Sequence, residues 1–308
     1  MQRPEISICI ATTRPAGLVR LLESLARQKL PPGLAVEIVV VDNAPCEASR
    51  AAALAWRGPG PLRRFEEPVR NIAAARNRAV DDASGRWLAF VDDDETVDEA
   101  WLAAYVERAR RGESDGFFGA VLPRLEEVAT RWLAPELFYA RPRHPTGTIL
   151  GRADLRTSNA LVRAALFQGR RFDLAYGRSG GSDTELFGRM LRSGACFEWC
   201  DEARVFEWIP RERHTPRWLV RRAFRGGVVW TRIQRSGAME RSGRRGLLRA
   251  LAAGLLLAAS LPLAALAGRR GLLRRWLRVC TQAGHVWAHL GRDFEEYAPD
   301  GSGEEGGG

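Results

Sequence analysis

The sequence of 308 residues contains almost no lysine: Lys29 is the only one, although basic residues number 47 against 37 acidic residues. Arginine therefore carries the net charge of +10. Because its planar guanidinium can bind phosphate through two parallel hydrogen bonds, this excess indicates phosphorylated substrates or anionic lipid as readily as nucleic acid. The sequence also has no zinc-finger spacing and no aromatic RNA-binding motif, so we expect no nucleic-acid partner.

Cysteine is also scarce, and the five cysteines are scattered along the chain. Their odd number argues against a disulfide framework and fits a reducing compartment. Cys196 and Cys200 share a short segment, but no second Cys or His pair beside them completes a zinc site. No Ser/His/Asp or Cys/His arrangement indicates a covalent nucleophile, and no signal-peptide pattern precedes the first expected strand. We therefore expect the catalytic part to stay in the cytoplasm.

Long apolar runs are absent except for one, at residues 250–267, which is rich in Leu and Ala and carries no charge. It is just long enough to span a bilayer core of about 30 Å. Arginines flank it on both sides, and Pro262 lies inside it. A full span, a re-entrant hairpin closed by residues 279–290 and an interfacial helix all remain open. A buried core helix is the alternative without a membrane.

These changes in composition divide the chain into three parts. We expect a catalytic domain at residues 1–240 and a basic and apolar helical segment at 241–296, with residues 244–290 against membrane lipid. The last part, 297–308, is rich in Gly, Ser and Glu and is expected to be disordered.

A cluster of three carboxylates follows the most distinct strand pattern. Residues 87–91 are apolar and predict a buried strand, which ends on Asp92, Asp93 and Asp94. Burying such charges without a partner costs several kcal/mol or more each. Mg²⁺ and Mn²⁺ prefer oxygen ligands, and ligands bind at strand ends in open α/β sheets, so the cluster is a candidate metal site. The alternative is a solvated acidic turn that caps the next helix.

The remaining pattern predicts an α/β fold. A strand at 5–11, a helix with leucines at 18–25 and a strand at 37–41 form a βαβ unit with parallel strands. The stretch 130–148 is irregular and rich in proline and aromatic residues, which is typical of a functional loop. Further on, a Gly-rich loop at 179–185 opens a helix.

Five motifs in a fixed order resemble the inverting glycosyltransferases of family 2. They lie at residues 6–15, 39–43, 71–77, 90–94 and 181–186, and the resemblance covers roughly residues 5–235. It implies the nucleotide-sugar-binding GT-A fold, a Rossmann-like mixed sheet flanked by helices. The sequence is most similar to bacterial members that build exopolysaccharide repeat units. The implied partners are a nucleotide-diphosphate sugar, most often a UDP-sugar, and a lipid-linked glycan acceptor at the cytoplasmic face of the inner membrane.

The resemblance also implies roles for individual residues. The nucleotide and donor would be bound by Thr12, Arg14, Asp42, Asn71, Arg76, Asp92 and Asp93. Asp42 would accept from the base, and Asp94 would bind Mn²⁺ or Mg²⁺ directly, with Asp92 and His214 as further candidates. Asp183 matches the catalytic base, which takes a proton from the acceptor hydroxyl in one in-line displacement. The alternative for Asp183 is a helix N-cap.

Two departures from the family pattern leave alternatives open. Ser182 stands where many relatives carry Glu, so Glu185 is a second candidate for the base. The Gln-x-x-Arg-Trp signature of processive members is absent, which suggests addition of a single sugar. In its place, residues 213–218 include His214, which is either near the metal and diphosphate or a surface residue. Arg217, Arg221 and Arg222 would contact the diphosphate or a pyrophosphoryl lipid, or would form a solvated cationic face against anionic headgroups.

Two other functions are alternatives to sugar transfer. A non-catalytic scaffold at the membrane would bind a nucleotide sugar without turning it over. A sugar-nucleotide pyrophosphorylase is disfavoured, because the Gly-rich activator loop expected after the first strand is missing.

Overall fold

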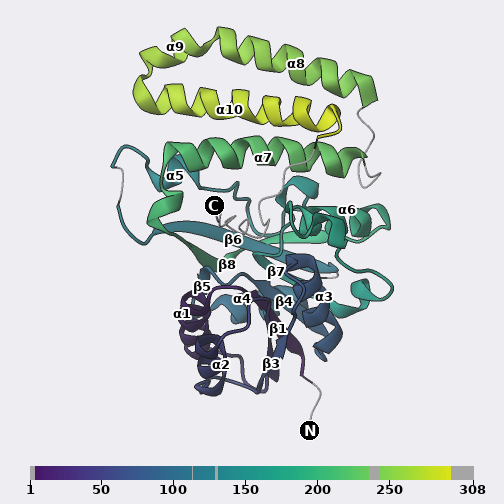
Figure 1. Ribbon diagram of the computed structural model, residues 1–308. Helices are drawn as coiled ribbons and strands as arrows, with labels where there is room; N and C mark the ends of the chain where they lie inside the picture. Colours follow the sequence, from purple (N-terminus) through teal and green to yellow (C-terminus); the bar gives the residue numbers. More distant parts are fainter. Residues whose placement is uncertain (1–3, 113, 129–130, 236–242, 293–308) are drawn as a thin grey trace, which may run out of the picture.

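The computed structural model describes residues 4–112, 114–128, 131–235 and 243–292 (Figure 1). Its strands form one sheet in the order β3-β2-β1-β4-β7-β6-β8-β5. The strands are β1 (Ile6–Thr12), β2 (Val36–Asp42), β3 (Leu62–Glu66), β4 (Trp87–Val91), β5 (Glu95–Val97), β6 (Gly116–Leu125), β7 (Asn159–Arg163) and β8 (Phe197–Ile209). The helices of the catalytic part are α1 (Pro15–Ala26), α2 (Glu47–Leu54), α3 (Ile72–Asp82), α4 (Trp101–Arg111), α5 (Pro135–Phe138), α6 (Ser182–Arg192) and α7 (Pro216–Arg235).

The first half of the sheet is parallel and the second half is mixed. β1 pairs in parallel with both β2 and β4, which confirms the βαβ unit expected from the sequence. β7 runs antiparallel to β4 and β6, and β8 runs parallel to β6. β8 is one continuous strand of 13 residues.

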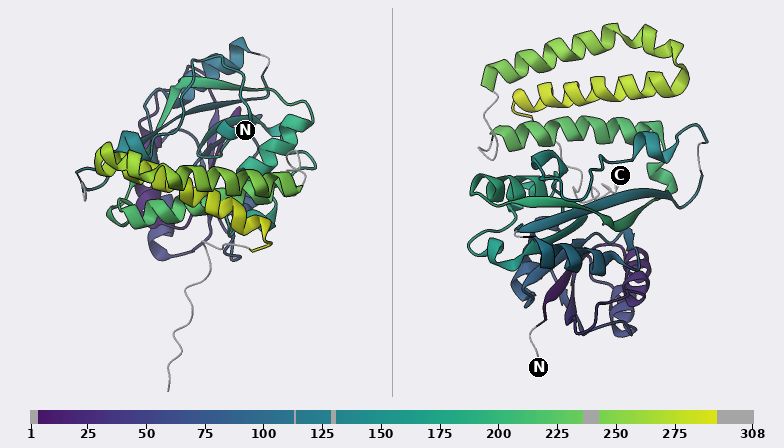
Figure 2. Two further views of the ribbon diagram at one scale, coloured as in Figure 1. Left: turned by 90° about the horizontal axis from the view of Figure 1, so that it is seen from above. Right: turned by 180° about the vertical axis from the view of Figure 1, so that it is seen from behind.

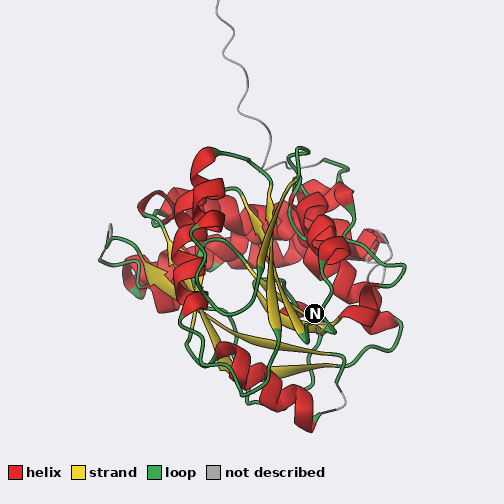
Figure 3. Ribbon diagram, turned by 90° about the horizontal axis from the view of Figure 1, so that it is seen from below, coloured by secondary structure: helices red, strands yellow, loops and turns green. Residues whose placement is uncertain are grey.

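Alternate side chains of the central strands face two hydrophobic cores, as the pleat requires. On one face, Ile8 and Ile38 pack with Leu21 of α1 and Tyr105 of α4. On the other face, the strands pack against residues of α3 and α6 such as Ala75 and Phe187. Figure 3 shows helices on both sides of the strands. The parallel strands β1, β2 and β4 are thereby held with their carboxyl ends at one edge.

The C-terminal part forms a helical hairpin stacked on α7 (Figures 1 and 2). It consists of α8 (Gly243–Ala259), α9 (Leu261–Leu266) and α10 (Gly268–His289), with α10 between α7 and α8. Two glycines allow the backbones of α7 and α10 to touch. A Cβ on Gly227 would stand 2.1 Å from the carbonyl oxygen of Thr281, and one on Gly284 would stand 2.0 Å from that of Phe224.

The uncharged run at residues 250–267 is therefore not one continuous helix. α8 ends at Ala259, Pro262 lies in the first turn of α9, and Gly268, with φ of 71°, opens α10. Across the described ranges, no helix combines the length and the apolarity needed to cross a bilayer. The run is also not a buried core helix, because Leu255 is 71% exposed. The boundary expected at residue 240 and the tail at 297–308 lie outside the described residues.

Candidate active site

Asp93 ties together the loops that follow β1 and β4. Its Oδ2 accepts from Thr12 Oγ1 at 3.0 Å and from the backbone N–H groups of Thr13 and Arg14 at 2.9 and 3.0 Å. Its Oδ1 accepts from Arg14 Nη2 at 2.8 Å. Asp93 is only 4% exposed. Its oxygens are thus already engaged by the protein, and its observed contacts hold the site together.

Asp92 and Asp94, by contrast, remain partly exposed. Asp94 Oδ2 accepts from Arg14 Nη2 at 3.0 Å and from Arg213 Nη1 at 3.1 Å. Asp92 Oδ1 accepts from Arg76 Nη2 at 3.0 Å. Burial raises the pKa of Asp92 above its ordinary value, and the charge of Arg76 opposes that rise. The acidic turn is thus paired with arginines, and it leads into strand β5. The expectation that it would be a solvated cap of the next helix was wrong.

Arg76 connects this acidic cluster to the start of α6. It projects from α3, and while Nη2 binds Asp92, Nη1 lies 3.5 Å from Ser182 Oγ. Ser182 is the first residue of α6, and Asp183 follows it. One guanidinium therefore spans from the end of β4 to the residue that precedes the predicted base.

Asp183 lies in the first turn of α6 with both oxygens near backbone donors. Oδ1 accepts from the N–H of Thr184 at 2.8 Å, and Oδ2 accepts from that of Thr157 at 3.4 Å. The N-cap is Gly181, with φ of 93°, so the N-cap alternative for Asp183 was wrong.

Glu185, the second candidate for the base, is buried and paired. Arg189 donates to it through Nε at 2.7 Å and Nη2 at 2.9 Å. Because both carboxylate oxygens are engaged one turn along the same helix, the geometry favours Asp183 as the group that meets an acceptor.

Asp42 and Asn71 occupy structural positions beside the cluster. Asp42 pairs with Thr12 in the sheet register, is 1% exposed, and accepts from Arg64 at 2.7 Å and from Ser49. Asn71 is the N-cap of α3, accepts from the N–H groups of Ala73 and Ala74, and donates to the carbonyl oxygen of Leu174 at 2.9 Å. The nucleotide-binding roles of both residues stay predictions.

His214 does not lie on the surface, so that alternative was wrong. The residue is fully buried, and its Nε2 lies 2.7 Å from the carbonyl oxygen of Leu133, with the ring of Tyr139 nearby at 6.0 Å. The neighbouring Arg213 is the residue that reaches Asp94. No group of three or more His, Cys, Asp or Glu side chains within the described ranges is arranged to hold a metal ion alone.

The sequence prediction missed several charged residues around the cluster. Glu95 is 1% exposed, and its Oε2 accepts from the N–H of Asp92 at 3.0 Å. Burial, followed by the charge of Asp92, raises the pKa of Glu95 well above its ordinary value. Arg141 pairs with Glu207 at 2.7 Å. Arg141 comes from the irregular stretch, where the only available signal was an excess of arginine.

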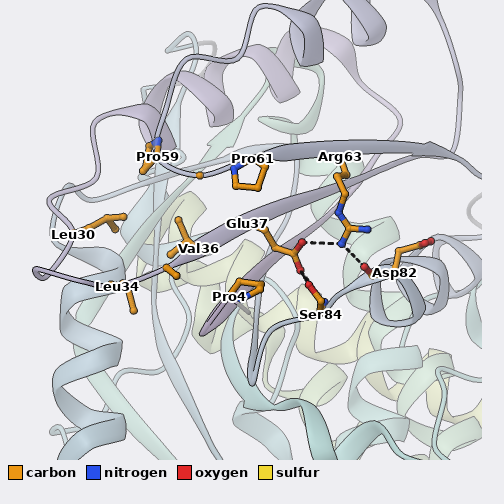
Figure 4. A pocket seen from close by; sticks show the side chains of 12 residues that line it. Pro4, Leu30, Leu34, Val36, Glu37, Pro59, Pro61, Arg63, Asp82 and Ser84 are labelled. Carbon is orange, nitrogen blue, oxygen red and sulfur yellow. Dashed lines mark hydrogen bonds and ion pairs between the residues drawn. The ribbon is translucent and has the colours of Figure 1, made fainter. Parts of the chain in front are cut away.

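A cavity of about 640 Å³ lies at the opposite ends of the strands (Figure 4). Its walls include Glu37, near the start of β2, and Arg63 of β3. Glu37 accepts from Ser7 and Ser84 and pairs with Arg63 at 2.7 Å. Burial raises the pKa of Glu37, but these hydrogen bonds outweigh it and the net pKa is lowered. The polar groups of this network bind one another, and they lie at the end of β2 opposite to Asp42. The cavity is therefore not the candidate active site.

Comparison with known proteins identifies the family. The model described as "Glycosyl transferase family 2" matches residues 7–175. The succinoglycan biosynthesis protein ExoM of Rhizobium meliloti is 35% identical over 235 residues, which is 74% of each chain. This chain belongs to glycosyl transferase family 2. The resemblance noted in the sequence is thereby confirmed, and the protein is a glycosyltransferase.

Solved structures with similar folds agree with the architecture of this glycosyltransferase. The mannosyltransferase PcManGT from Pyrobaculum calidifontis, in complex with GDP-Man and Mn²⁺, has a TM-score of 0.63 at 17% identity. That match covers 95% of this chain and 89% of the other. S. aureus TarS 1-349 in complex with UDP-GlcNAc has a TM-score of 0.56 at 16% identity, covering 93% and 90%. The mixed sheet flanked by helices is therefore the predicted GT-A fold.

Proposed function

We propose that this glycosyltransferase moves one sugar from a nucleotide-diphosphate donor, in the first instance a UDP-sugar, to a lipid-linked glycan acceptor with inversion at the anomeric carbon. The observation that carries the proposal is the bridge from Asp92 through Arg76 to Ser182, the residue that precedes Asp183 on α6. The name of ExoM supports a role in bacterial exopolysaccharide assembly. Relatives in fold crystallised with GDP-Man and UDP-GlcNAc support a nucleotide-sugar donor.

The donor side would be formed by Asp94 and the two arginines on its Oδ2. Arg14 and Arg213 come from different elements, and each guanidinium has further N–H groups that could donate hydrogen bonds to a diphosphate. The partly exposed carboxylates of Asp92 and Asp94 fit a divalent cation, because Mg²⁺ typically takes one or two carboxylates and completes its shell with phosphates and water. We assign Asp94 as the direct ligand of Mn²⁺ or Mg²⁺, which would offset the charge of the leaving diphosphate.

The acceptor side would be formed by Asp183. Its carboxylate takes the proton of the acceptor hydroxyl while that oxygen bonds to the anomeric carbon and the bond to the nucleoside diphosphate breaks. Asp183 stands in the first turn of α6, at the end of the helix where the backbone N–H groups point toward a bound group. No covalent intermediate with the enzyme is needed, so one displacement inverts the configuration.

The outer face of the hairpin supports the membrane part of the proposal. Its exposed apolar side chains include Leu248, Leu255, Leu256, Leu263 and Leu266, which are 66–85% exposed. Residues 241–292 also contain ten arginines and no acidic residue. A bilayer with anionic headgroups is the occupant that satisfies both the apolar side chains and this one-signed charge. The enzyme would then lie on the cytoplasmic face of the inner membrane.

A groove of about 370 Å³ between α7 and α10 supports a lipid-linked acceptor. Phe224, Trp276 and Val279 line it, and Arg217 and Arg221 stand among the lining residues. Apolar walls beside cationic groups suit the chain and the phosphate of a membrane lipid.

Replacing Leu255 and Leu256 with glutamate should weaken binding to anionic vesicles at least tenfold, because two charges would enter the lipid-facing surface. Vesicle sedimentation with phosphatidylglycerol measures this. Leu54→Glu is the matched control, since Leu54 is 73% exposed on α2, away from the hairpin. Equal loss in both variants, or no loss in either, would argue against membrane docking through this face.

The proposed reaction is tested by incubating the purified enzyme with a panel of labelled UDP-sugars and GDP-sugars, Mn²⁺ and a membrane extract. We expect one donor to label a lipid fraction with a single sugar, and NMR of the product to show inversion. A non-catalytic scaffold would bind a donor in calorimetry yet release no nucleoside diphosphate. That outcome would reject the enzymatic proposal for this chain.

A further inference from the structure

Arg222 of α7 carries a charge that no described residue meets in an ion pair. Its guanidinium lies 5.3 Å from the ring centroid of Trp218 and 6.0 Å from that of Tyr139. Its Nη1 is buried without a hydrogen-bond partner, and no described residue forms an ion pair with it. Burying an unpaired guanidinium is unfavourable, so its retention points to a partner that arrives from outside the chain.

Arg156 is a second arginine without a partner, close to Asp183. The residue after it, Thr157, donates its N–H toward Asp183 Oδ2 at 3.4 Å. Arg156 also lines a small cavity of about 20 Å³ together with Arg141 and Ser158. Among the residues that the structure describes, none forms a hydrogen bond or ion pair with the Arg156 side chain. It stands on the Thr157 side of Asp183, whereas Arg76 contacts Ser182.

Arg141 adds positive charge beside both arginines and engages Glu207, an acid that acts on Arg222. It donates to Ser158 Oγ at 2.6 Å and to Glu207 Oε2 at 2.7 Å, so Glu207 is already engaged. Burial, followed by the charge of Arg141, lowers the pKa of Arg156. Burial also lowers the pKa of Arg222, where Arg141 opposes the raising effect of Glu207. Positive charge from Arg156, Arg141 and Arg222 therefore gathers near Asp183, and Asp183 and Asp154 are the acids that oppose it at Arg156.

The position of α7 shows from which side an anion would come. This helix bears Arg222 and packs through Gly227 against α10, so it separates the sheet from the hairpin (Figure 1). On the proposed function, the hairpin rests on the membrane. A group attached to a membrane lipid would therefore pass α7 before it reached Asp183.

We propose that Arg156 and Arg222 form an anion site for the acceptor, which receives the diphosphate that joins the glycan to its lipid. The arginines hold this diphosphate and thereby place the glycan hydroxyl next to Asp183. They are positioning residues, because they would contact the diphosphate of the acceptor and not the hydroxyl that reacts. The two arginines could also bind the carboxylate of an acidic sugar. The experiment below distinguishes this carboxylate from the diphosphate. This inference rests on the proposed transfer to a lipid-linked acceptor.

Binding of farnesyl diphosphate, measured by calorimetry with UDP and Mn²⁺ saturating the donor side, tests the site without requiring turnover. We expect Arg156→Gln to weaken binding about tenfold, as for loss of one charge-assisted contact. Arg222→Gln should do the same, but Arg156 is the primary variant because Arg222 also packs on Trp218. Arg57→Gln, which removes an exposed arginine from another part of the surface, should bind like the wild type.

Three results would overturn the proposal. If UDP abolishes binding of farnesyl diphosphate, the arginines serve the donor. If a glucuronic-acid oligosaccharide, but not farnesyl diphosphate, loses affinity in Arg156→Gln, the anion is a sugar carboxylate. Unchanged binding of farnesyl diphosphate in both variants would also reject it. In transfer assays with the native acceptor, the variants should raise the acceptor KM and leave the donor KM unchanged, whereas absence of any transfer by the wild type would instead reject the proposed function.

Discussion

Asp94→Asn should lower kcat for sugar transfer by about 10²- to 10³-fold, as for the loss of a group that stabilises charge in a transition state. The substitution keeps the shape of the side chain but removes the charge that would hold a cation. Because Asp94 is partly exposed and contacts the side chains of Arg14 and Arg213, we expect the fold to survive. Initial rates at saturating donor and Mn²⁺, together with thermal unfolding, measure both effects.

The adjacent residue provides a matched control. Asp93→Asn disrupts a buried carboxylate that accepts from Thr12, Thr13 and Arg14. We expect it to lower the free energy of unfolding by about 2 kcal/mol or more, since hydrogen bonds to charged groups are worth roughly 1.5–3 kcal/mol. Neighbouring acids would thus separate into one that affects turnover and one that affects stability. Full activity of Asp94→Asn in excess chelator would contradict the assignment.

Asp183→Asn should reduce transfer by about 10²- to 10⁴-fold, the usual contribution of a general base. Asparagine keeps the shape of the side chain, and its single carbonyl oxygen can still accept from the N–H of Thr184. Its NH2 group cannot take a proton and cannot accept from Thr157, whose contact at 3.4 Å is the longer of the two. Donor affinity should remain unchanged, because the substitution acts on the acceptor side. Single-turnover transfer and calorimetry with UDP distinguish the two effects.

Glu185→Gln separates the two candidates for the base. Glu185 pairs with Arg189 through both oxygens, so its substitution should cost stability and leave the rate of transfer within a few fold. The opposite pattern, with Glu185→Gln inactive and Asp183→Asn active, would move the base to Glu185. Indifference of the protein to Asp183→Asn would instead favour a scaffold without catalysis.

The parallel half of the sheet could be predicted from the sequence because its signals are local. The apolar strands that end at Thr12, Asp42 and Val91 fix where each chain segment leaves the core, and parallel pairing brings those ends to one edge. The acids and arginines at that edge were therefore expected to meet. The different roles of Asp93 and Asp94 were not predicted. Asp93 is buried whereas Asp94 is partly exposed, and this difference depends on tertiary packing.

Other features depend on contacts distant in the sequence. His214 looked like a residue of a basic loop, yet the ring is buried beside Leu133, some eighty residues earlier. The length of the apolar run at 250–267 predicted a possible membrane span. Instead, breaks at Ser260 and Gly268 reverse the chain direction, and the resulting hairpin packs on α7. Arg156 carries no motif of its own. Its position beside Asp183 follows from Thr157, whose contact with α6 no local pattern reveals.

Calorimetric titration of UDP, with and without Mn²⁺, into the wild type and Asp94→Asn tests most directly whether Asp94 holds a cation that grips the donor diphosphate. We expect Mn²⁺ to tighten UDP binding at least tenfold in the wild type and to have no effect in the variant. Equal UDP affinity in all four measurements would show that the acidic cluster does not bind the donor through a metal.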